Sequence, residues 1–412
     1  MTAGQHGTVI VGASVAGVAV ADALRKNGYD APVRILDALP VMPHNRPPLS
    51  KQALEPGHDD ARLALRPEPY FSAAGIDLLL GCRAVGLTAG EPTAGRVSVQ
   101  TDGGVTLAAD EVVLAPGAAP RRLPGPSMLP SVHVLRSLPD AVALRAALSS
   151  GSRVVIAGCG FIGAEVAAAA CKRGLEVTVI ESAPRPFEAL VGRPPAAALV
   201  RLHRDHGVRL LTGTGVAGIA GAGRAEAVVL ADGRRLPADV VVLGLGVLPA
   251  VDWLAGSGIA LANGIICDRY GRTNLPGVHA VGDAAAWPDP FTGVPRRIEH
   301  WTTAQQQGAA VGHNIACPDQ LQSVPAVPYF WSDQHGVRIQ SLGWLEGADE
   351  IRCVHGDWDS DEFVALYRRG DHLAGALGVG AARQLMPWRP TIERRAPWSE
   401  VSGQSEPMGM TA

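Results

Sequence analysis

The chain has 412 residues and carries 36 basic and 39 acidic side chains, for a formal net charge of −3. This length exceeds one ordinary hydrophobic core, so we predict two or three domains. Hydrophobic residues make up 47% of the sequence and charged residues 18%, which excludes disorder for the bulk of the chain, and the near-neutral charge excludes a general attraction to nucleic acid or an anionic membrane.

The cysteines and the apolar N-terminus indicate a compartment. Six cysteines occur as scattered single residues without a CxxC motif, which favours a reducing cytoplasm over a disulfide scaffold. The apolar stretch from residue 8 to residue 23 follows no Lys or Arg and is interrupted by Gly12, Ser14 and Gly17, so we do not expect a secretory signal. We expect a cytoplasmic protein with no membrane span, nucleic-acid partner or metal site.

The first predicted unit spans residues 8–37 and reads as strand, glycine turn, helix and strand. Gly12, Ser14 and Gly17 occupy the turn, and Asp37 ends the second strand. A phosphate-binding turn needs small residues for its tight bend, for the approach of backbone N–H groups to a pyrophosphate and for close helix-to-strand packing. Serine departs from glycine at the middle position but is still small. The unit predicts dinucleotide binding, with an ordinary structural turn as the alternative.

The second predicted unit repeats this pattern over residues 153–181. Gly158, Gly160 and Gly163 satisfy all three requirements of the turn, an Ala-rich helix follows, and Glu181 ends the second strand. Two copies of one unit in one chain indicate two nucleotide sites more strongly than either copy alone.

The acids at the two strand ends predict the chemistry of the nucleotides. Asp37 and Glu181 occupy the position that accepts hydrogen bonds from the hydroxyl groups of an adenosine ribose. A carboxylate there repels a 2′-phosphate, so Glu181 favours NADH over NADPH. The alternative is an exposed acid without a ligand, and nearby Arg185 would soften the preference.

Further along the chain, two crossover segments separate the units. The segments 111–125 and 238–249 each place a strand before a Gly- and Pro-rich turn, and Asp283 follows a short strand within the segment 274–286. A turn-rich section with alternating apolar residues starts near residue 325 and is typical of antiparallel strands. We predict a discontinuous first domain, an inserted second domain, a C-terminal domain and a loose tail, at residues 1–115 and 242–322, 116–241, 323–397 and 398–412.

Several short sequence motifs, which we call words, together indicate a specific family. They are NRPPLSK (45–51), LAPGAAPRRLPG (114–125), AGCGFIGAE (157–165), VGDAAAW (281–287), RIEHWTTAQQQG (297–308) and YFWSDQHG (329–336). On these words the chain resembles the flavoprotein ferredoxin reductases of the rubredoxin- and putidaredoxin-reductase type, which supply electrons to oxygenases. The resemblance implies an α/β fold of glutathione-reductase-like architecture, with two Rossmann-like, doubly wound dinucleotide-binding domains and a C-terminal α+β domain.

The resemblance also implies two cofactors and their contacts. FAD would be held by the first unit and the residues around it, namely Gly12, Ser14, Ala16, Gly17, Asp37, Arg46, Lys51, Val85, Arg136, Asp283 and Trp301. NADH would be held by Gly158, Gly160, Ile162, Gly163, Glu165, Glu181 and Gly244, with Glu299 and Trp331 beside the nicotinamide. The chain has His44 where family members often carry Tyr, which leaves the details of nicotinamide specificity open.

Lys51 is a candidate catalytic residue on composition. Only Lys26, Lys51 and Lys172 are lysines among the 36 basic residues, so a lysine in a Pro-rich loop suggests that a compact ammonium group is required, near the flavin N5. Related flavoproteins pair such a lysine with the glutamate of the second glycine turn, here Glu165. The alternative is a solvated loop lysine.

Two tryptophans and two arginine groups complete the candidates. Trp331 is expected to shield the transfer site from water, and Trp301 is either a second shield or a core aromatic. A small positive surface is expected to steer an acidic iron–sulfur protein to the flavin. Its candidate residues are Arg296 and Arg297, or alternatively Arg389, Arg394 and Arg395.

The expected function is that of an NADH-dependent ferredoxin reductase serving a Rieske-type or haem-thiolate oxygenase. A hydride donor releases two electrons together whereas an iron–sulfur partner accepts one, and a flavin connects the two. A second possible function is that of an enzyme with the same fold whose electron acceptor is a disulfide, peroxide, quinone or ascorbate radical. The sequence has no CxxxxC pair in the first helix and no cysteine near NRPPLSK, which disfavours the disulfide and peroxide acceptors. A third alternative is a flavin-bearing redox sensor.

Overall fold

The computed structural model describes residues 6–89, 96–123, 129–150, 153–324 and 327–401. The chain forms two compact units. The first contains residues 1–46, 60–119 and 248–325, and the second contains residues 47–59, 120–247 and 326–412. No helix in the described ranges combines the length and the apolar character that crossing a bilayer requires.

The first unit is built on a five-stranded parallel sheet with the order β20-β7-β1-β2-β3. Its strands are β1 (Thr8–Val11), β2 (Val33–Asp37), β3 (Ile76–Leu80), β7 (Glu111–Leu114) and β20 (Val278–Ala280). All four residues of β1 are buried. Such a run of mainly β-branched residues suits a central strand that is covered on both faces.

Helices and two smaller sheets complete the first unit. The helices are α1 (Val15–Lys26), α2 (Glu68–Ala73) and α7 (Trp301–Ala316). The smaller sheets contain β4 (Ala84–Ala89), β5 (Val97–Thr101) and β6 (Thr106–Ala109), and β18 (Leu261–Ala262), β19 (Gly264–Ile266), β21 (Ala285–Pro288) and β22 (Pro295–Arg297).

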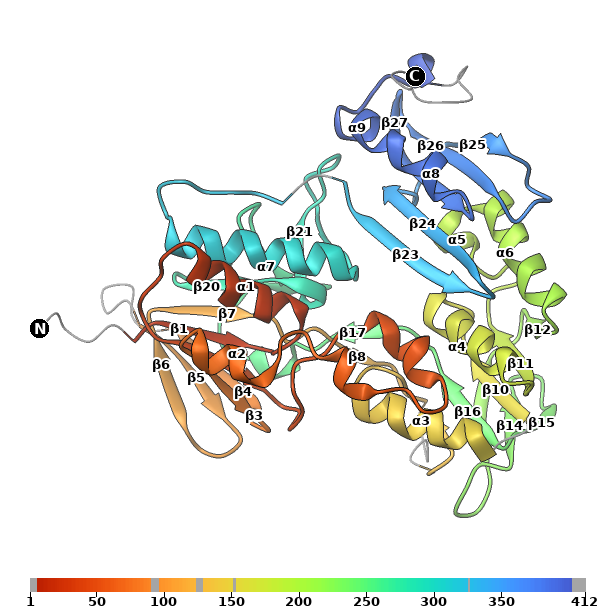
Figure 1. Ribbon diagram of the computed structural model, residues 1–412, viewed down its shortest axis with the longest axis horizontal. Helices are drawn as coiled ribbons and strands as arrows, with labels where there is room; N and C mark the ends of the chain where they lie inside the picture. The colour runs from red at the N-terminus through yellow and green to blue at the C-terminus, as the bar shows by residue number, and fades with distance from the viewer. Residues whose placement is uncertain (1–5, 90–95, 124–128, 151–152, 325–326, 402–412) are drawn as a thin grey trace, which may run out of the picture. The chain divides into compact units, whose positions relative to one another are not determined.

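Helices α1 and α7 lie side by side and approach at backbone distance (Figure 1). A Cβ atom added at Gly308 would lie 2.3 Å from the carbonyl oxygen of Ala16, and one added at Gly312 would lie 2.4 Å from that of Val20. Any larger residue at these two positions would push the helices apart. The AQQQG word therefore reflects close helix packing behind the first glycine turn.

The second unit repeats the parallel sheet with the order β12-β11-β10-β16-β9. Its strands are β9 (Val132–His133), β10 (Arg153–Ala157), β11 (Glu176–Glu181), β12 (Arg209–Thr212) and β16 (Val240–Leu243). Its helices are α3 (Leu138–Ser150), α4 (Phe161–Lys172), α5 (Glu188–Val191) and α6 (Arg193–Asp205). A three-stranded antiparallel sheet contains β13 (Val216–Ala220), β14 (Ala227–Leu230) and β15 (Arg235–Pro237). A separate pair, β8 (Ala118–Pro120) with β17 (Val247–Pro249), occurs at two of the points in the sequence where the chain changes unit.

The C-terminal section of the second unit is a five-stranded antiparallel sheet with the order β23-β24-β27-β26-β25. Its strands are β23 (Tyr329–Gln334), β24 (Val337–Gly343), β25 (Glu350–Gly356), β26 (Phe363–Arg369) and β27 (His372–Val379), followed by α8 (Ala382–Leu385), α9 (Arg389–Glu393) and α10 (Trp398–Val401). Two Rossmann-like sheets and this α+β section confirm the predicted fold class. The sequence predicted a loose tail from residue 398, but α10 is helical with Val401 1% exposed, and the remainder of that stretch, 402–412, lies outside the described residues.

The segment 47–59 belongs to the second unit, although the sequence grouped it with the first. It forms two 3₁₀ turns, η1 (Pro47–Ser50) and η2 (Gln52–Leu54). Arg145 donates to the carbonyl of Ala53 at 2.8 Å, and Arg173 donates to that of Leu54 at 2.9 Å. These bonds attach the segment to α3 and to the end of α4, which fixes the backbone on either side of Lys51.

Candidate functional site

The first glycine turn joins β1 to α1 in the geometry of a nucleotide-binding turn. Gly12 has a φ of 111°, and a Cβ there would lie 2.1 Å from the carbonyl oxygen of Ala115. A Cβ at Gly17 would lie 1.9 Å from the carbonyl oxygen of Gly12. Only glycine fits at either position, because one lies in the left-handed region against a neighbouring strand and the other lies at the helix-to-strand contact.

The second turn, between β10 and α4, repeats this geometry closely. Gly158 has a φ of 102°, and its added Cβ would lie 2.2 Å from the carbonyl oxygen of Gly244. A Cβ at Gly163 would lie 2.3 Å from the carbonyl oxygen of Gly158, whereas one at Gly160 would meet nothing within 4 Å. The middle position thus points into open space, which explains why Ser14 fits at the matching place in the first turn.

The two strand-end acids hold their own turns. Asp37 accepts a hydrogen bond from the backbone N–H of Ala13 at 2.7 Å, and Glu181 accepts one from that of Cys159 at 2.8 Å. In each unit the acid therefore reaches the turn at the position where an adenosine ribose is bound in nucleotide-binding folds. The residues fit two dinucleotides: each turn has the tight bend, the open middle position and an acceptor for ribose hydroxyl groups. A small cavity beside Asp37 is lined by Ser14 and Arg46 among others.

Lys51 and Glu165 form a buried ion pair in the second unit. The Lys51 Nζ lies 3.1 Å from Glu165 Oε1, and their side chains are 11% and 7% exposed. Lys51 lies between the two 3₁₀ turns, and Glu165 lies in the first half of α4. This confirms the predicted ion pair and contradicts the alternative of a solvated loop lysine. Its position at a flavin stays a prediction.

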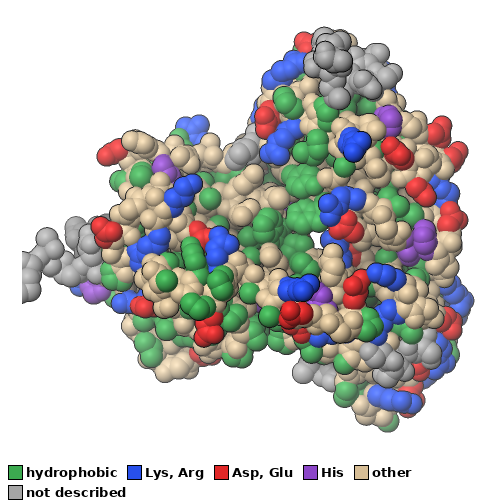
Figure 2. Space-filling model, in the orientation of Figure 1, with side chains coloured by type: hydrophobic (Ala, Val, Ile, Leu, Met, Phe, Trp, Pro, Cys, Tyr) green, Lys and Arg blue, Asp and Glu red, His purple; other side chains and the backbone are tan. Residues whose placement is uncertain are grey.

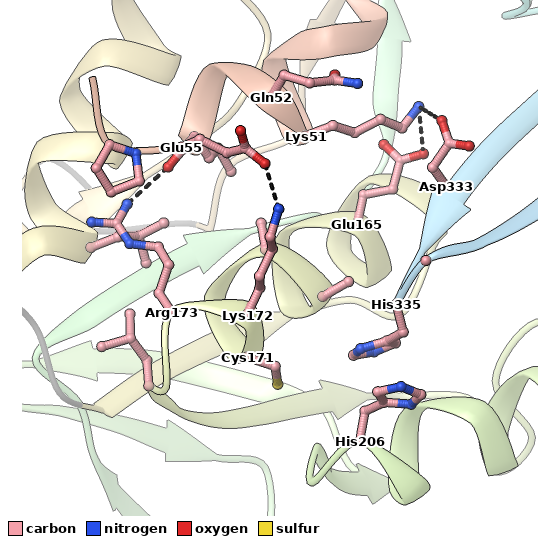
Figure 3. Close-up of a pocket in the computed structure, with 17 residues that line it drawn as sticks. Lys51, Gln52, Glu55, Glu165, Cys171, Lys172, Arg173, His206, Asp333 and His335 are labelled. Atoms are coloured by element: carbon pink, nitrogen blue, oxygen red, sulfur yellow. Dashed lines mark hydrogen bonds and ion pairs between the residues drawn. The ribbon is translucent and has the colours of Figure 1, made fainter. Parts of the chain in front are cut away.

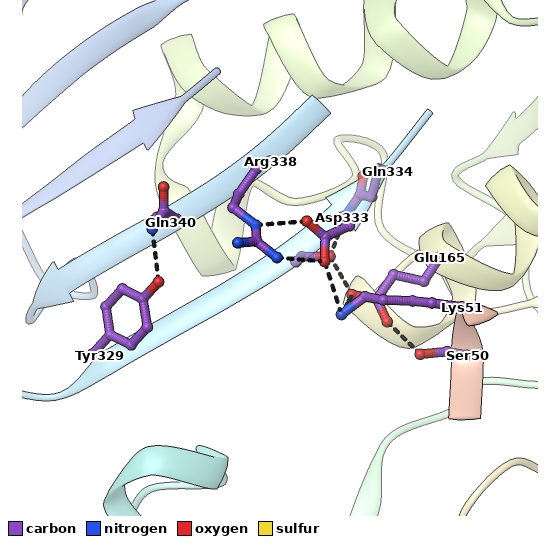
Figure 4. Close-up of polar contacts among 9 residues, drawn as sticks. Ser50, Lys51, Glu165, Tyr329, Asp333, Gln334, Arg338 and Gln340 are labelled. Carbon is purple, nitrogen blue, oxygen red and sulfur yellow. Dashed lines mark hydrogen bonds and ion pairs between the residues drawn. The ribbon is translucent and has the colours of Figure 1, made fainter. Parts of the chain in front are cut away.

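Two serines complete the surroundings of Glu165 (Figure 4). Ser50 donates to Oε2, and Ser332 donates to Oε1 at 2.5 Å. Burial raises the pKa of Glu165, and the Lys51 ammonium and the two hydroxyl groups oppose that effect. The sequence reasoning missed both serines, although each is next to a singled-out residue or word, Lys51 and the tryptophan of YFWSDQ.

Asp333 gives Lys51 a second anionic neighbour. Its Oδ2 lies 3.6 Å from the Lys51 Nζ, and its Oδ1 accepts from Arg338 at 2.7 Å. Although burial alone would raise the pKa of Asp333, Arg338 and Lys51 outweigh it and hold that pKa below its usual range. The Lys51 Nζ also lies 5.8 Å from the ring centre of Trp331, within the range of a cation–π contact. All three predicted catalytic residues, Lys51, Glu165 and Trp331, are therefore brought together.

A cavity of about 1070 Å³ in the second unit opens on this group (Figure 3). Lys51, Glu165 and Asp333 line one part of it, and His206 and His335 line another. Lys172 and Glu55, which pair at 2.7 Å, form part of the wall. The Lys51 ammonium thus lies at a wall that small solutes can reach, although it is nearly covered.

In the first unit, Arg297 joins two predicted site positions. Its Nη1 donates to the backbone carbonyl of Asp283 at 2.6 Å, and its Nη2 pairs with Glu299 at 2.8 Å. Trp301 begins α7 two positions further along, and Gly282 donates its N–H to Gln307 on that helix. Arg297 is 8% exposed and anchors this loop locally, which leaves little of its side chain accessible for the predicted docking role.

The other predicted residues are placed as follows. Val85 (β4) and Ile162 (α4) are 45% and 43% exposed, and Ala16 (α1) is 5% exposed. The backbone N–H of Arg136 donates to Asp140 at the start of α3. Arg136 therefore belongs to the second unit, as Lys51 does, whereas most of the other FAD candidates belong to the first. Gly244 follows β16 beside the second turn.

The candidate docking arginines differ in their availability. Arg296 is 30% exposed and lies 3.6 Å from Asp289. Arg389 pairs with Glu393, Arg394 pairs with Glu400, and Arg395 is exposed. Basic and acidic side chains intermingle on the face shown in Figure 2. Across the described ranges, His, Cys, Asp and Glu side chains form no cluster suited to a metal ion.

Comparison with known proteins identifies the family to which the chain is similar. Residues 6–308 match the family model described as pyridine nucleotide-disulphide oxidoreductase, and residues 329–404 match the model described as reductase C-terminal. The chain is 36% identical to rhodocoxin reductase of Rhodococcus erythropolis over 94% of this chain and 90% of that protein, and 35% identical to putidaredoxin reductase of Pseudomonas putida over 94% and 92%.

A solved structure of a relative is similar to this chain over nearly its whole length. The covalent complex of putidaredoxin reductase with putidaredoxin contains a chain that superposes with a TM-score of 0.90 at 32% identity, covering 96% of this chain and 94% of the other. Two glycine turns with their acids, a matched C-terminal section and this likeness over nearly the whole length confirm the resemblance noted in the sequence. The chain belongs to the pyridine nucleotide-disulphide oxidoreductase family, among the ferredoxin reductases that include putidaredoxin reductase and rhodocoxin reductase.

Proposed function

We propose that this protein is an NADH-dependent ferredoxin reductase that takes hydride from NADH onto FAD and passes single electrons to an iron–sulfur ferredoxin feeding an oxygenase. The observation that carries the proposal is the pair of equivalent nucleotide turns in one chain, each closed by its own strand-end acid. One turn is suited to the flavin nucleotide and the other to the nicotinamide nucleotide. The relatives named as ferredoxin reductases support the choice of acceptor.

The first unit would hold FAD and the second NADH. Gly12, Ser14 and Gly17 would let the α1 N-terminus approach the flavin pyrophosphate, with Asp37 at the ribose, and Gly158, Gly160 and Glu181 would do the same for NADH. When bound, FAD accepts the two electrons of a hydride and releases them one at a time. We further propose FAD contacts at Val85, Arg136, Asp283 and Trp301, and we assign one nucleotide-binding domain to each cofactor.

Lys51 would place a compact positive charge at the reduced flavin, and Glu165 would hold that ammonium in position. An ammonium that is 11% exposed is little screened by water, so its field on a nearby anionic ring is stronger than at the surface. Trp331 beside Lys51 would keep water away from the same place. The chain's own contribution is thus the placement of charge and the exclusion of solvent.

A ferredoxin partner requires a docking surface on this protein. We propose that Arg296 contributes to that surface, with Arg389, Arg394 and Arg395 as the alternative. The cytoplasm is the proposed location, since the six cysteines are free thiols.

The test uses the purified protein and three measurements. We expect a yellow protein with one non-covalently bound FAD, rapid bleaching of the flavin by NADH in a stopped-flow instrument, and cytochrome c reduction that depends on an added ferredoxin from a panel. Rapid flavin reduction without transfer to any ferredoxin, but with transfer to a quinone or peroxide, would replace ferredoxin as the acceptor. Slow reduction by NADH throughout would favour a redox sensor instead.

A further inference from the structure

A chain of hydrogen bonds runs from the surface of the large cavity to Glu165 through residues that have no part in the proposed function. His335 and His203 are joined at 3.0 Å between Nε2 and Nδ1, and His203 Nε2 lies 2.9 Å from Gln334 Oε1. Gln334 Nε2 donates to Ser332 Oγ at 3.0 Å, and Ser332 donates to Glu165 at 2.5 Å. Figure 4 shows Gln334 on the same strand as Asp333, near the Glu165 carboxylate.

The ionised carboxylate gives this chain a single direction. A carboxylate only accepts hydrogen bonds, so Ser332 must direct its proton toward Glu165 and accept from the amide nitrogen of Gln334. The amide oxygen of Gln334 then faces His203, which must carry its proton on Nε2 and accept from His335 on Nδ1. Every donor therefore points toward Glu165.

Burial prevents water from replacing three of these partners. Ser332 and Gln334 are 0% exposed, and His203 is 1% exposed. Burial also lowers the pKa of His203, and burial together with the neighbouring His203 and His206 lowers the pKa of His335 to about 3, so both imidazoles are neutral near pH 7. Other charged groups around the chain are Lys51 and Asp333 with its partner Arg338. His206 stacks on His335 with a ring-centre separation of 4.3 Å.

Protonation of Glu165 would favour the opposite direction. A protonated carboxyl could donate to Ser332, which would then donate to an amide oxygen at Gln334. That arrangement requires the amide of Gln334 to turn over and both histidines to exchange tautomers together. The N–H of His203 therefore opposes the hydrogen-bond pattern that suits a neutral Glu165.

We propose that Gln334 and His203 are positioning residues that keep Glu165 ionised, and thereby keep Lys51 held, by fixing the direction of the Ser332 hydrogen bond. The chain of bonds stands on the geometry alone, whereas its consequence for the flavin rests on the proposed function. The tests below measure the two separately.

The first test measures stability against pH and needs no catalytic readout. An acid whose folded-state pKa is raised loses stability as the pH rises from its unfolded-state pKa through its folded-state pKa. Ser332→Ala and His203→Leu raise the pKa of Glu165 further, so their loss in melting temperature relative to the parent is expected to grow between pH 5 and pH 8. Ser341→Ala, on the adjacent strand and 5% exposed, is the matched control for Ser332→Ala, with a pH-independent loss. His133→Leu, 9% exposed, is the matched control for His203→Leu, because burial lowers the pKa of both imidazoles and the removal of either one by itself makes the loss grow with pH. Equal pH dependence in variants and controls would overturn the inference.

A double variant isolates the role of the amide. His203→Leu acts by freeing the Gln334 amide to turn over, whereas Gln334→Met has no amide oxygen to offer Ser332. The double variant His203→Leu/Gln334→Met is therefore expected to lose the pH-dependent part of the effect seen in His203→Leu. Simple addition of the two single effects would show that His203 does not act through Gln334.

The second test connects the chain to the flavin. Gln334→Glu keeps the shape of the side chain but replaces the amide donor toward Ser332 with a carboxyl oxygen, so the apparent pKa in the pH profile of flavin reduction by NADH is expected to rise by about one unit or more. Gln340→Glu, which makes the same change at a residue bonded to Tyr329, is expected to leave the profile in place. An equal shift in both would overturn the inference. The expected stability result with an unmoved profile in Gln334→Glu would instead retain the hydrogen-bond chain and reject the proposed role of Lys51 at the flavin.

Discussion

At the scale of single residues, the two strand-end acids have a structural role besides the ligand-binding role proposed for them. Glu181 accepts N–H bonds from Cys159 and, through its other oxygen, from Ala183 at 2.9 Å. Asp37 makes the equivalent pair of bonds with Ala13 and Leu39. A substitution at either acid therefore loosens its turn even before a nucleotide binds.

We predict that the parent enzyme has a higher kcat/KM with NADH than with NADPH, and that Glu181→Gln lowers this ratio by about tenfold or more, because a carboxylate facing a 2′-phosphate costs several kcal/mol. Steady-state kinetics with both nucleotides measure the ratio. Asp37→Asn is the matched control, since it changes the other turn and is expected to weaken FAD retention while leaving the ratio unchanged. An equal ratio in parent and Glu181→Gln would contradict the role of Glu181.

Lys51 offers a second test at this scale. We predict that Lys51→Met slows flavin reduction by NADH about 10²-fold or more, the scale of losing one preorganised electrostatic contact. The variant also leaves a buried carboxylate without its cation, at a cost of about 3–5 kcal/mol near neutral pH. This cost should shrink toward pH 5, because Glu165, whose pKa burial already raises, then binds a proton.

Chemical denaturation at pH 5 and pH 8 and stopped-flow reduction supply the two measurements for Lys51→Met. Lys172→Met is the control, since Lys172 is 74% exposed and its ion pair with Glu55 is a surface pair. If the flavin is reduced as fast in Lys51→Met as in Lys172→Met, Lys51 takes no part in the reaction.

At the scale of elements, the packing of α1 against α7 determines where the first turn lies. The glycines of α7 allow its backbone to approach α1 directly behind the residues that follow Gly12 and Ser14. The loop of Asp283 is joined to α7 by the bond between Gly282 and Gln307. The first glycine turn and the Asp283 loop, two predicted FAD-binding segments, thus share one support.

We predict that Gly308→Ala destabilises the protein by about 1–3 kcal/mol and lowers the FAD content, because the added methyl group would lie 2.3 Å from the carbonyl of Ala16. Thermal unfolding and the ratio of flavin to protein absorbance measure the two effects. Gly218→Ala on β13 is the control, since its methyl group would meet nothing within 4 Å. Equal stability of the two variants would mean that the helices separate without cost.

At the scale of the whole molecule, the mixture of charges leaves partner recognition to small local groups. The net charge is −3, and Figure 2 shows both signs interspersed on the visible face. Arg297 is taken up by Asp283 and Glu299, which leaves Arg296 as the more exposed member of that pair of arginines.

We predict that Arg296→Gln raises the KM for ferredoxin at low ionic strength and leaves flavin reduction by NADH within about twofold of the parent, since rim charges act mainly on the rate of encounter. The difference should diminish as salt is added. Arg235→Gln, at an exposed position on β15, is the control. An unchanged KM for ferredoxin at low salt would contradict docking at Arg296 and favour the alternative surface formed by Arg389, Arg394 and Arg395.

The sequence predicted what depends on local patterns. Both nucleotide turns, their acids and the antiparallel C-terminal section follow from residue spacing within short stretches, and the pairing of Lys51 with Glu165 followed from the family likeness. Contacts between distant segments could not be predicted in this way. The hydroxyl donors Ser50 and Ser332, the attachment of residues 47–59 to the second unit and the burial of Arg297 all depend on packing between parts of the chain that carry no signal of their mutual distance.

The grouping of residues 47–59 with the second unit has a consequence for the order in which the protein is completed during synthesis. Ser50 meets Glu165 across 115 positions of sequence, and Ser332 meets Glu165 across 167. A nascent chain can form the first glycine turn early, but the surroundings of Lys51 stay incomplete until β23 has left the ribosome. Chains that terminate before the C-terminal sheet contain Lys51 and Glu165 but lack Ser332 and Asp333, so premature termination leaves the surroundings of Lys51 incomplete.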